Sequence, residues 1–483
     1  MKKRVLEGLE PNRVFYHFEN ICMIPHGSGN EEKLCDYCEE FARAHSLSSI
    51  RDNANNLIIF KAGTKGYENH PAIIIQGHLD MVCAKRDGAE IDMQKDPLKL
   101  KIYGEYLGAE DTSLGGDDGI AVAYCLALLE SDDIPHPPLE IVLTTDEEVG
   151  MTGAFALDTS PLTAKMMLNI DSENEGVFTV GCAGGLRINT RTDIERESVT
   201  RCVAKITVGG LLGGHSGVEI NCGRANSNIV LGKLLKAIGD QCEISLISLS
   251  GGEKDNVITS LSSAEIACNT KDFEKISSLI EAFEKSFKNE FGEVEKGAFF
   301  TLENKGEMTV SATKKSDSDN ILSYISSLPF GVYRMSEEIK GLVETSNNFG
   351  VLLLEESSLR ADFSVRSSKM RERDLLAEKI CDIAKSHGSK CEIKAPYPAW
   401  EYKAESHLRE VMVESYKRLT GETPEIEVIH AGLECGLFSE RIEGLDAVSI
   451  GPNMKEIHSF NERLEINSVE RTWEFIKEVL KNL

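Results

Sequence analysis

The sequence has no run approaching the ~20 consecutive apolar residues of a membrane-spanning helix, so no membrane association is expected. Its first residues, MKKRVLEGLEP, carry positive charge but no apolar stretch, which argues against a secretory signal. The 13 cysteines are odd in number and scattered, without the regular spacing of a disulfide framework. In a chain of this length, this usage predicts reduced thiols and a cytoplasmic protein.

Positive charge is also scarce. The chain has 53 Lys and Arg against 79 Asp and Glu, a formal net charge of −26. So acidic a surface repels phosphate backbones and anionic membranes, which excludes nucleic acid as an expected partner. It favours divalent cations wherever carboxylates converge.

Two common active-site motifs are incomplete in this sequence. The glycines of GGLLGG (209–214) are not followed by Lys-Ser or Lys-Thr, so they do not form a phosphate-binding loop. Ser216 stands beside His215 but outside a G-x-S-x-G turn, which excludes that serine hydrolase pattern.

Cys35 and Cys38 have zinc-knuckle spacing without a second pair, so we expect buried thiols on one helical face.

The order of expected elements in the first part of the chain is typical of an α/β fold. At 483 residues the chain exceeds what one hydrophobic core usually supports, so two or three structural units are expected. The strand containing Ile73, Ile74 and Ile75 is apolar on successive positions, as in a strand buried on both faces. Strands alternating with helices predict a central mixed, mostly parallel sheet flanked by helices. The expected strands lie at 72–75, 139–145 and 165–171, and the helices at 30–46 and 119–130.

The character of the sequence changes near residue 190. The segment 187–396 predicts a separate α+β unit that ends near APYPAW. Its expected elements are helices at 226–238, 272–288 and 370–386 and a half-exposed, alternating strand at 359–368.

The last part of the chain is too short to form a sheet of its own. It predicts a helix at 401–419, the strand DAVSIG at 446–451 and a helix at 468–480. The simplest arrangement is that this strand completes the first sheet. We therefore predict a catalytic domain formed by 1–186 and 397–483, with 187–396 inserted as a lid domain.

Ionisable side chains stand where the expected strands and loops of the outer segments end. In open α/β sheets, ligands bind beyond the carboxyl ends of the strands. Each group alone has an ordinary explanation, such as a turn residue, a solvated acid or a helix cap, and a cap is an equal alternative for Asp118. Their joint occurrence indicates a metal site, because so many carboxylates would otherwise repel each other. The groups are His78, Asp80, Asp117, Asp118, Glu147, Glu148, Asp171 and His458.

The spacing of these groups fits a site for two ions. Positions 78 and 80 of a strand point to the same side, so His78 can bind a metal while Asp80 accepts its other ring N–H. Glu147 and Glu148 are neighbours and point in different directions, so one can ligate while the other acts as a base. Two histidines and three carboxylates exceed the needs of one catalytic zinc, but suit two ions that share a bridging carboxylate.

Several motifs in order resemble the M20-type di-zinc metallopeptidases, the family that includes aminoacylases and cytosolic dipeptidases. They are HLDMV, LGGDDG, TTDEEVGMTGA, NIDSENEG, GGHSG and IHSFNERL. Three motifs are similar to the branch of aminoacyl-histidine dipeptidases in particular: DEEVGMTGA, GGHSGVEINCGRAN and HAGLECG. The resemblance covers nearly the whole chain.

The resemblance implies a role for each group. Asp117 would bridge two Zn²⁺ ions, and the peptide bond after it would be cis. Both acids of LGGDDG could bind a cation, and alignment through Gly119 favours Asp117 over Asp118 as the bridge. The remaining roles are His78 and Asp171 on one ion, Glu148 and His458 on the other, Glu147 as general base and Asp80 as the partner of His78.

The resemblance also implies that the inserted unit contributes to substrate binding. His215 matches a lid histidine of the family, although a loop histidine held by glycines is the alternative. Asn256 and Arg366 stand where this branch has substrate-binding residues. The enlarged lid resembles the form that replaces contacts with a partner subunit, and a homodimer is the alternative.

The expected activity is hydrolysis of dipeptides, including Xaa-His dipeptides, by a metal-activated water. Nitrogen and oxygen ligands accept Co²⁺ or Mn²⁺ as well as Zn²⁺. The alternatives are another hydrolase of the same clan, such as a tripeptidase, aminoacylase or deacetylase, and a non-catalytic metal-binding scaffold. A scaffold predicts loss of the base, yet Glu147 is present.

Overall fold

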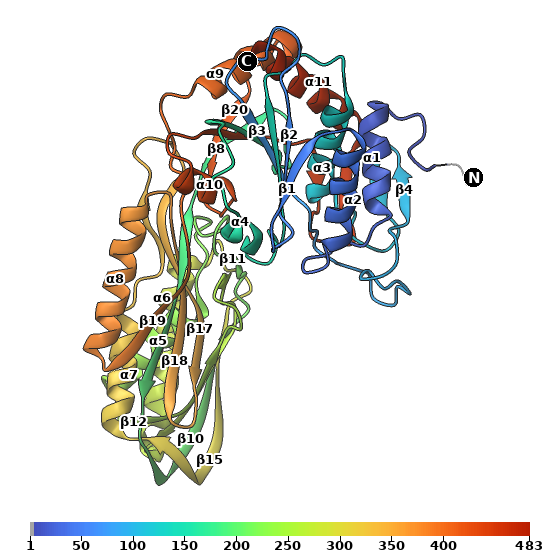
Figure 1. Cartoon of the computed structure of the whole chain (residues 1–483). Coiled ribbons are helices and arrows are strands. Elements are labelled where there is room, and N and C mark those ends of the chain that lie inside the picture. The colour runs from blue at the N-terminus through green and yellow to red at the C-terminus, as the bar shows by residue number, and fades with distance from the viewer. Residues whose placement is uncertain (1–3) are drawn as a thin grey trace. The chain divides into compact units, whose positions relative to one another are not determined.

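The computed structural model describes residues 4–483 and contains two compact units (Figure 1). Unit 1 comprises the chain up to Gly181 together with Tyr402–Val428 and Leu433–Leu483. Unit 2 comprises Cys182–Glu401 and Ile429–Gly432. No helix within residues 4–483 combines the length and the apolar character that crossing a membrane requires.

Unit 1 is built around a mixed eight-stranded sheet. Its central strands β6, β3, β7 and β21 are parallel, and β1, β2 and β8 pair antiparallel at its flanks. In spatial order the strands are β1 (Ser48–Arg51), β2 (Leu57–Lys61), β6 (Leu139–Thr144), β3 (Ile73–His78), β7 (Met166–Asn169), β21 (Asp446–Ser449), β8 (Val177–Cys182) and β20 (Glu425–Ile429). The predicted α/β class and the predicted place of the C-terminal strand are confirmed.

Helices and a small second sheet complete unit 1. The helix α3 has every side chain from Gly119 to Leu129 buried, as its continuous apolar sequence predicts. The helices are α1 (Asn12–Cys22), α2 (Glu32–Ala44), α3 (Gly116–Glu130), α4 (Thr152–Ala156), α9 (His407–Thr420), α10 (Cys435–Arg441) and α11 (Ile466–Asn482). The small sheet contains β22 (Met454–Lys455), β23 (Arg463–Glu465), β5 (Tyr106–Ala109) and β4 (Leu100–Tyr103).

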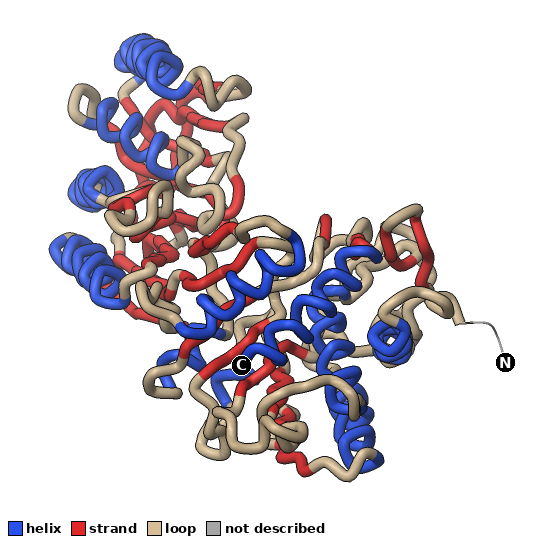
Figure 2. Tube along the Cα trace, turned by 90° about the horizontal axis from the view of Figure 1, so that it is seen from above, coloured by secondary structure: helices blue, strands red, loops and turns tan. Residues whose placement is uncertain are grey.

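Unit 2 is an antiparallel nine-stranded sheet with α5, α6, α7 and α8 gathered on one face (Figures 1 and 2). In order its strands are β15 (Phe299–Thr313), β10 (Arg196–Gly209), β14 (Ser262–Cys268), β12 (Ile244–Gly251), β17 (Val343–Leu354), β18 (Ser358–Ser367), β9 (Gly184–Asp193) and β19 (Ser389–Tyr397), with β16 (Gly331–Met335) on β17. The remaining elements are the ribbon β11 (Gly214–His215) and β13 (Val257–Ile258), the short 3₁₀ helix Thr270–Asp272, α5 (Ser227–Gly239), α6 (Phe273–Phe291), α7 (Lys315–Ser327) and α8 (Met370–Ser386).

Three local predictions are wrong. The strand β18 is not half exposed, because it lies between β17 and β9 with helices over one face, and only Arg360 on it is exposed. The helix predicted from residue 401 begins at His407, where the side chain of Ser406 caps it. Cys381 on α8 and Cys391 on β19 form a disulfide rather than two reduced thiols, because the packing of α8 on β19 brings their Cα atoms to 5.7 Å. Cys35 and Cys38, by contrast, are buried free thiols as predicted.

Candidate metal centre

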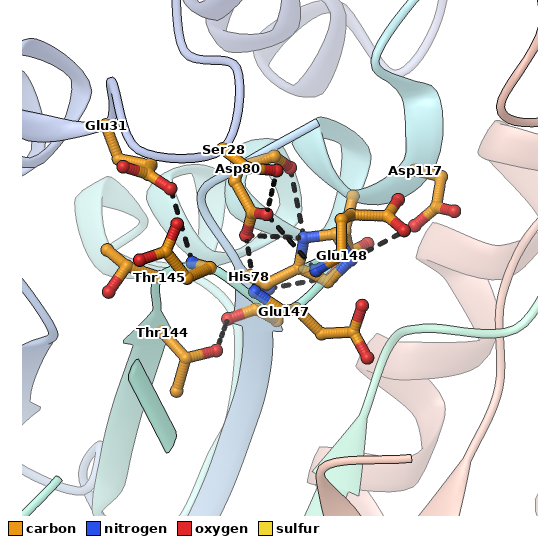
Figure 3. Close-up of polar contacts among 12 residues, drawn as sticks. Ser28, Glu31, His78, Asp80, Asp117, Thr144, Thr145, Glu147 and Glu148 are labelled. Carbon is orange, nitrogen blue, oxygen red and sulfur yellow. Dashed lines mark hydrogen bonds and ion pairs between the residues drawn. The ribbon is translucent and has the colours of Figure 1, made fainter. Parts of the chain in front are cut away.

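The carboxyl ends of the central parallel strands of unit 1 bring the predicted ionisable groups together, and Figure 3 shows His78, Asp80, Asp117, Glu147 and Glu148 among them. His78 is the last residue of β3, Glu147 and Glu148 follow β6, and Asp171 follows β7. These strands are neighbours and run in the same direction, so their ends meet at one edge of the sheet. Asp117 reaches this edge from the start of α3, where Gly115 turns the chain with a left-handed φ of 68°.

Asp117 lies between the two histidines. Its Oδ1 is 3.1 Å from Nε2 of His78, and its Oδ2 is 3.1 Å from Nε2 of His458. The Nε2 atom of each imidazole also lies near a second acid. His78 Nε2 lies 3.6 Å from Oδ1 of Asp171, and His458 Nε2 lies 2.8 Å from Oε1 of Glu148. The arrangement is therefore symmetrical about Asp117.

Asp118 occupies a different environment from Asp117. Its side chain is fully buried, and its Oδ2 accepts the main-chain N–H of His78 at 3.0 Å. Although its carboxylate also lies within 4.8 Å of ligand atoms of His78 and Asp171, it faces only one imidazole. The peptide bond between Asp117 and Asp118 is cis, as the resemblance implied.

The electrostatics of the site favour positive charge at two positions. Burial opposes protonation of His78, but hydrogen bonds to Asp117 and Asp171 outweigh burial and raise its pKa well above the ordinary value. Hydrogen bonds to Asp117 and Glu148 raise the pKa of His458 to about 10. A site that stabilises two positive charges beside these acids, with imidazole nitrogen and carboxylate oxygen as donors, fits a pair of divalent ions.

Asp80 supports both His78 and the loop after β6. Nδ1 of His78 lies 3.0 Å from the main-chain oxygen of Asp80 and 3.4 Å from its carboxylate Oδ1. The same carboxylate accepts the main-chain N–H groups of Glu147 at 2.9 Å and Glu148 at 3.2 Å, and the hydroxyl of Ser28 at 2.8 Å. Asp80 therefore links the end of β3 to the loop that carries both glutamates, a role that its spacing from His78 does not predict.

Glu147 stands beside this cluster as an additional acid. Burial raises its pKa well above the ordinary value, and the neighbouring acids Asp171 and Glu434 act in the same direction. His78 acts in the opposite direction. A carboxylate that holds a proton more readily than usual is suited to proton transfer near neutral pH.

Two buried glutamates of the site were missed by sequence reasoning. Glu462 lies in IHSFNERL and accepts the N–H groups of Leu114, Gly115 and Gly116 at 2.7 to 3.1 Å. Glu434 lies in HAGLECG and accepts hydrogen bonds from Gln76 and Thr144. The first could have been found, because a glycine-rich loop that opens a helix leaves several N–H groups in need of an acceptor. The second carries no such signal.

The burial of Glu462 leads to a testable pH dependence. Burial and the charge of Asp117 raise its pKa from an ordinary 4.5 to about 7. Its contribution to the free energy of unfolding is therefore full below pH 4.5 and is lost as the pH rises toward 7. In chelator-treated protein, Glu462→Gln should remove about 1–3 kcal/mol of the decline in unfolding free energy over this pH range.

Denaturant unfolding at several pH values measures this decline. The matched control is Glu470→Gln on the exposed face of α11, in which the unfolding free energy should decline with pH as it does in the unmodified protein. An equal decline in the Glu462→Gln variant and the unmodified protein would contradict the raised pKa of Glu462.

The three residues predicted to bind substrate all lie in unit 2. His215 on β11 pairs with Val257 on β13, and Asn256 precedes that strand, its main-chain oxygen accepting the N–H of Ser216. Burial and the nearby charge of Arg366 lower the pKa of His215, so its imidazole is neutral near pH 7.

Arg366 is held without an acidic partner. Its Nη1 donates to the hydroxyl of Tyr397 at 2.9 Å, and its buried Nε has no hydrogen-bond partner. Within residues 4–483 no carboxylate lies within ion-pair distance of this guanidinium. An unpaired guanidinium fork of this kind suits recognition of a carboxylate.

Comparisons with known proteins agree with this geometry. Residues 74–482 match the model of peptidase family M20/M25/M40. The chain is 37% identical over 480 residues to the cytosol non-specific dipeptidase of Escherichia coli (strain K12), and the alignment covers 99% of both chains.

Solved structures extend the comparison. The aminoacylhistidine dipeptidase of Vibrio alginolyticus is similar with a TM-score of 0.91 and 34% identity, covering 99% of this chain and 98% of that one. The aminopeptidase PepT of Bacillus cereus has a TM-score of 0.58 at 16% identity, covering 98% of this chain and 99% of that one, and shares the fold.

Proposed function

This chain belongs to peptidase family M20/M25/M40, and from that membership we propose that it is a dipeptidase whose active site is the metal centre around Asp117. The observation that carries the proposal is the position of the Asp117 carboxylate, with an imidazole Nε2 on each oxygen and a second acid near each of these Nε2 atoms. The end-to-end similarity to two dipeptidases supports the reaction class.

We propose that the residues hold two divalent ions, with Asp117 shared between them. His78 and Asp171 would complete one set of ligands, and Glu148 and His458 the other. The family is metal-dependent, and we propose zinc as the native metal, with cobalt or manganese able to replace it. Bound there, the ions would polarise the scissile carbonyl and lower the pKa of a shared water.

Glu147 is the proposed general base. Its raised pKa suits a group that accepts a proton from water and then donates it to the leaving amine. Asp80 fixes the position of this base through the hydrogen bond from the Glu147 N–H, and it holds the ring of His78 through Nδ1. One buried carboxylate thus positions both the proposed base and a proposed metal ligand.

We further propose that unit 2 supplies substrate contacts. Arg366, with its unpaired Nε, would bind the free carboxylate of a dipeptide. His215, neutral and half buried, can donate a hydrogen bond to the oxyanion of the tetrahedral intermediate, and Asn256 would add a polar contact. The function of residues 187–396 as a lid domain, with 1–186 and 397–483 as the catalytic domain, stays a prediction.

The proposed substrates are unblocked dipeptides, including Xaa-His dipeptides such as β-Ala-His. The acidic surface argues against nucleic-acid partners, and we propose a cytoplasmic location. A homodimer is compatible with this proposal but is not required by it.

A panel of substrates tests the proposal. β-Ala-His, Ala-His, Ala-Ala, a tripeptide and an N-acetyl amino acid are incubated with the purified chain, and the released amino acids are quantified. We expect the dipeptides to be cleaved at least about tenfold faster, in kcat/KM, than the tripeptide and the acylated compound. Cleavage confined to the tripeptide would indicate a tripeptidase, and cleavage confined to the N-acetyl compound an aminoacylase. Cleavage of no compound by metal-loaded protein would indicate a scaffold.

A further inference from the structure

Glu434 is a buried acid beneath the metal centre that the mechanism above does not use. It lies immediately before α10 and has no exposed surface. Its Oε2 accepts a hydrogen bond from Nε2 of Gln76 at 2.6 Å and another from the hydroxyl of Thr144 at 2.7 Å. Its Oε1 is buried without a hydrogen-bond partner. A substrate cannot reach this side chain, so any effect on the reaction must pass through its neighbours.

Those neighbours form a polar chain across three adjacent strands. Gln76 on β3 donates to Glu434 and accepts a hydrogen bond from Nδ2 of Asn169 on β7 at 2.5 Å. Thr144 is the last residue of β6. The chain therefore ties the ends of β6, β3 and β7 in a layer below the metal centre. The hydrogen bonds of such a buried network hold its side chains in a defined geometry.

Along the sequence, the polar chain is nearer to the ligands of one proposed ion than to those of the other. Gln76 is two residues before His78, and Asn169 is two residues before Asp171. Thr144, by contrast, is four residues before Glu148, and the loop between them is held separately by Asp80.

The groups that act on the ionisation of Glu434 include both side chains proposed for this ion, His78 and Asp171. Burial raises the pKa of Glu434 to about 8, Asp171 and Asp80 act in the same direction, and His78 and the hydrogen bond from Thr144 oppose them. Within the described part of the chain, no Lys or Arg forms an ion pair with Glu434. Without a basic partner, the buried carboxyl group interacts mainly with the hydrogen-bond donors of β3 and β6.

We infer that Glu434 is a positioning residue that sets the spacing of His78 and Asp171, and so selectively supports the ion proposed to lie between them. The inference rests on the proposed function, because it presupposes two ions. It assigns Glu434 a role through Gln76, Thr144 and Asn169 rather than a contact with substrate. Changes to residues that orient metal ligands typically cost 10- to 100-fold in metal affinity.

Chelator competition with zinc measures this selectivity, because it resolves the affinities of the two ions. Glu434→Ala should weaken one ion by about 10- to 100-fold and leave the other within about threefold. Glu434→Gln keeps an acceptor oxygen for Gln76 and Thr144, and should restore the affinity to within about threefold of the unmodified protein. Glu440→Ala, an exposed acid on α10, is the matched control and should change neither ion.

Two ions weakened equally, no ion weakened, or a Gln variant as impaired as the Ala variant would each overturn the inference. Circular dichroism checks that the variants fold. If Glu434→Ala fails to fold, Thr144→Val is tested instead. It removes one hydrogen-bond donor to Glu434 and should lower the affinity for the same one of the two ions. Unmodified protein that binds fewer than two ions would instead refute the proposed function, so the two failures are distinguishable.

Discussion

Replacing Glu147 with Gln is expected to lower kcat for dipeptide hydrolysis by about 10²- to 10⁴-fold while the protein keeps its metal. The amide has nearly the same shape but cannot accept the proton of the attacking water. Glu147 is not among the proposed ligands, and its main-chain N–H would still bind Asp80. Metal content should therefore stay at the value of the unmodified protein.

Steady-state kinetics on Ala-His, together with metal analysis of the same sample, check this expectation. The matched control is Glu474→Gln on the exposed face of α11, which should retain full turnover. A Glu147→Gln variant that keeps more than a tenth of the normal kcat would show that another group moves the proton. Loss of metal together with activity would place Glu147 among the ligands instead.

Replacing Asp117 with Ala is expected to affect both ions at once. One oxygen of Asp117 faces His78 and the other faces His458, so a single substitution removes a ligand from each proposed position. The two remaining ligands at each position would be insufficient for tight binding. We expect fewer than one tightly bound ion per chain and a loss of turnover of at least about 10³-fold.

Asp118→Asn is the informative comparison for Asp117→Ala. Asn keeps an oxygen that can accept the main-chain N–H of His78, so this variant should retain two ions. Equilibrium dialysis against zinc, followed by metal analysis, measures both variants. The reverse result, with ions lost in Asp118→Asn and kept in Asp117→Ala, would assign the bridge to Asp118.

Much of unit 1 was predictable because buried parallel strands can be recognised in the sequence, and the candidate ligands directly follow them. Ile73, Ile74 and Ile75 are fully buried on a central parallel strand, and such strands deliver whatever follows them to a common edge. Burying ionisable groups such as His78 and Asp80 at the end of a core strand is energetically costly unless they have partners. Their presence there therefore indicates that the folded chain supplies such partners, which are Asp117 for His78 and the Glu147 N–H for Asp80.

Residues whose partners are distant in the chain were harder to predict. Glu434 accepts hydrogen bonds from Gln76, 358 residues away in the chain, and from Thr144, 290 residues away. No local sequence pattern predicts such contacts. Burial of β18 likewise depends on strands β9 and β17 and on helices that the alternation of its own side chains does not reveal. The disulfide between Cys381 and Cys391 depends on how α8 packs on β19.

The most direct test of the whole account is a count of tightly bound metal ions per chain, made together with Ala-His hydrolysis before and after chelation. Two ions per chain, loss of hydrolysis on chelation and recovery on adding back zinc are the predicted results. Undiminished hydrolysis by protein shown to be free of metal would contradict the account.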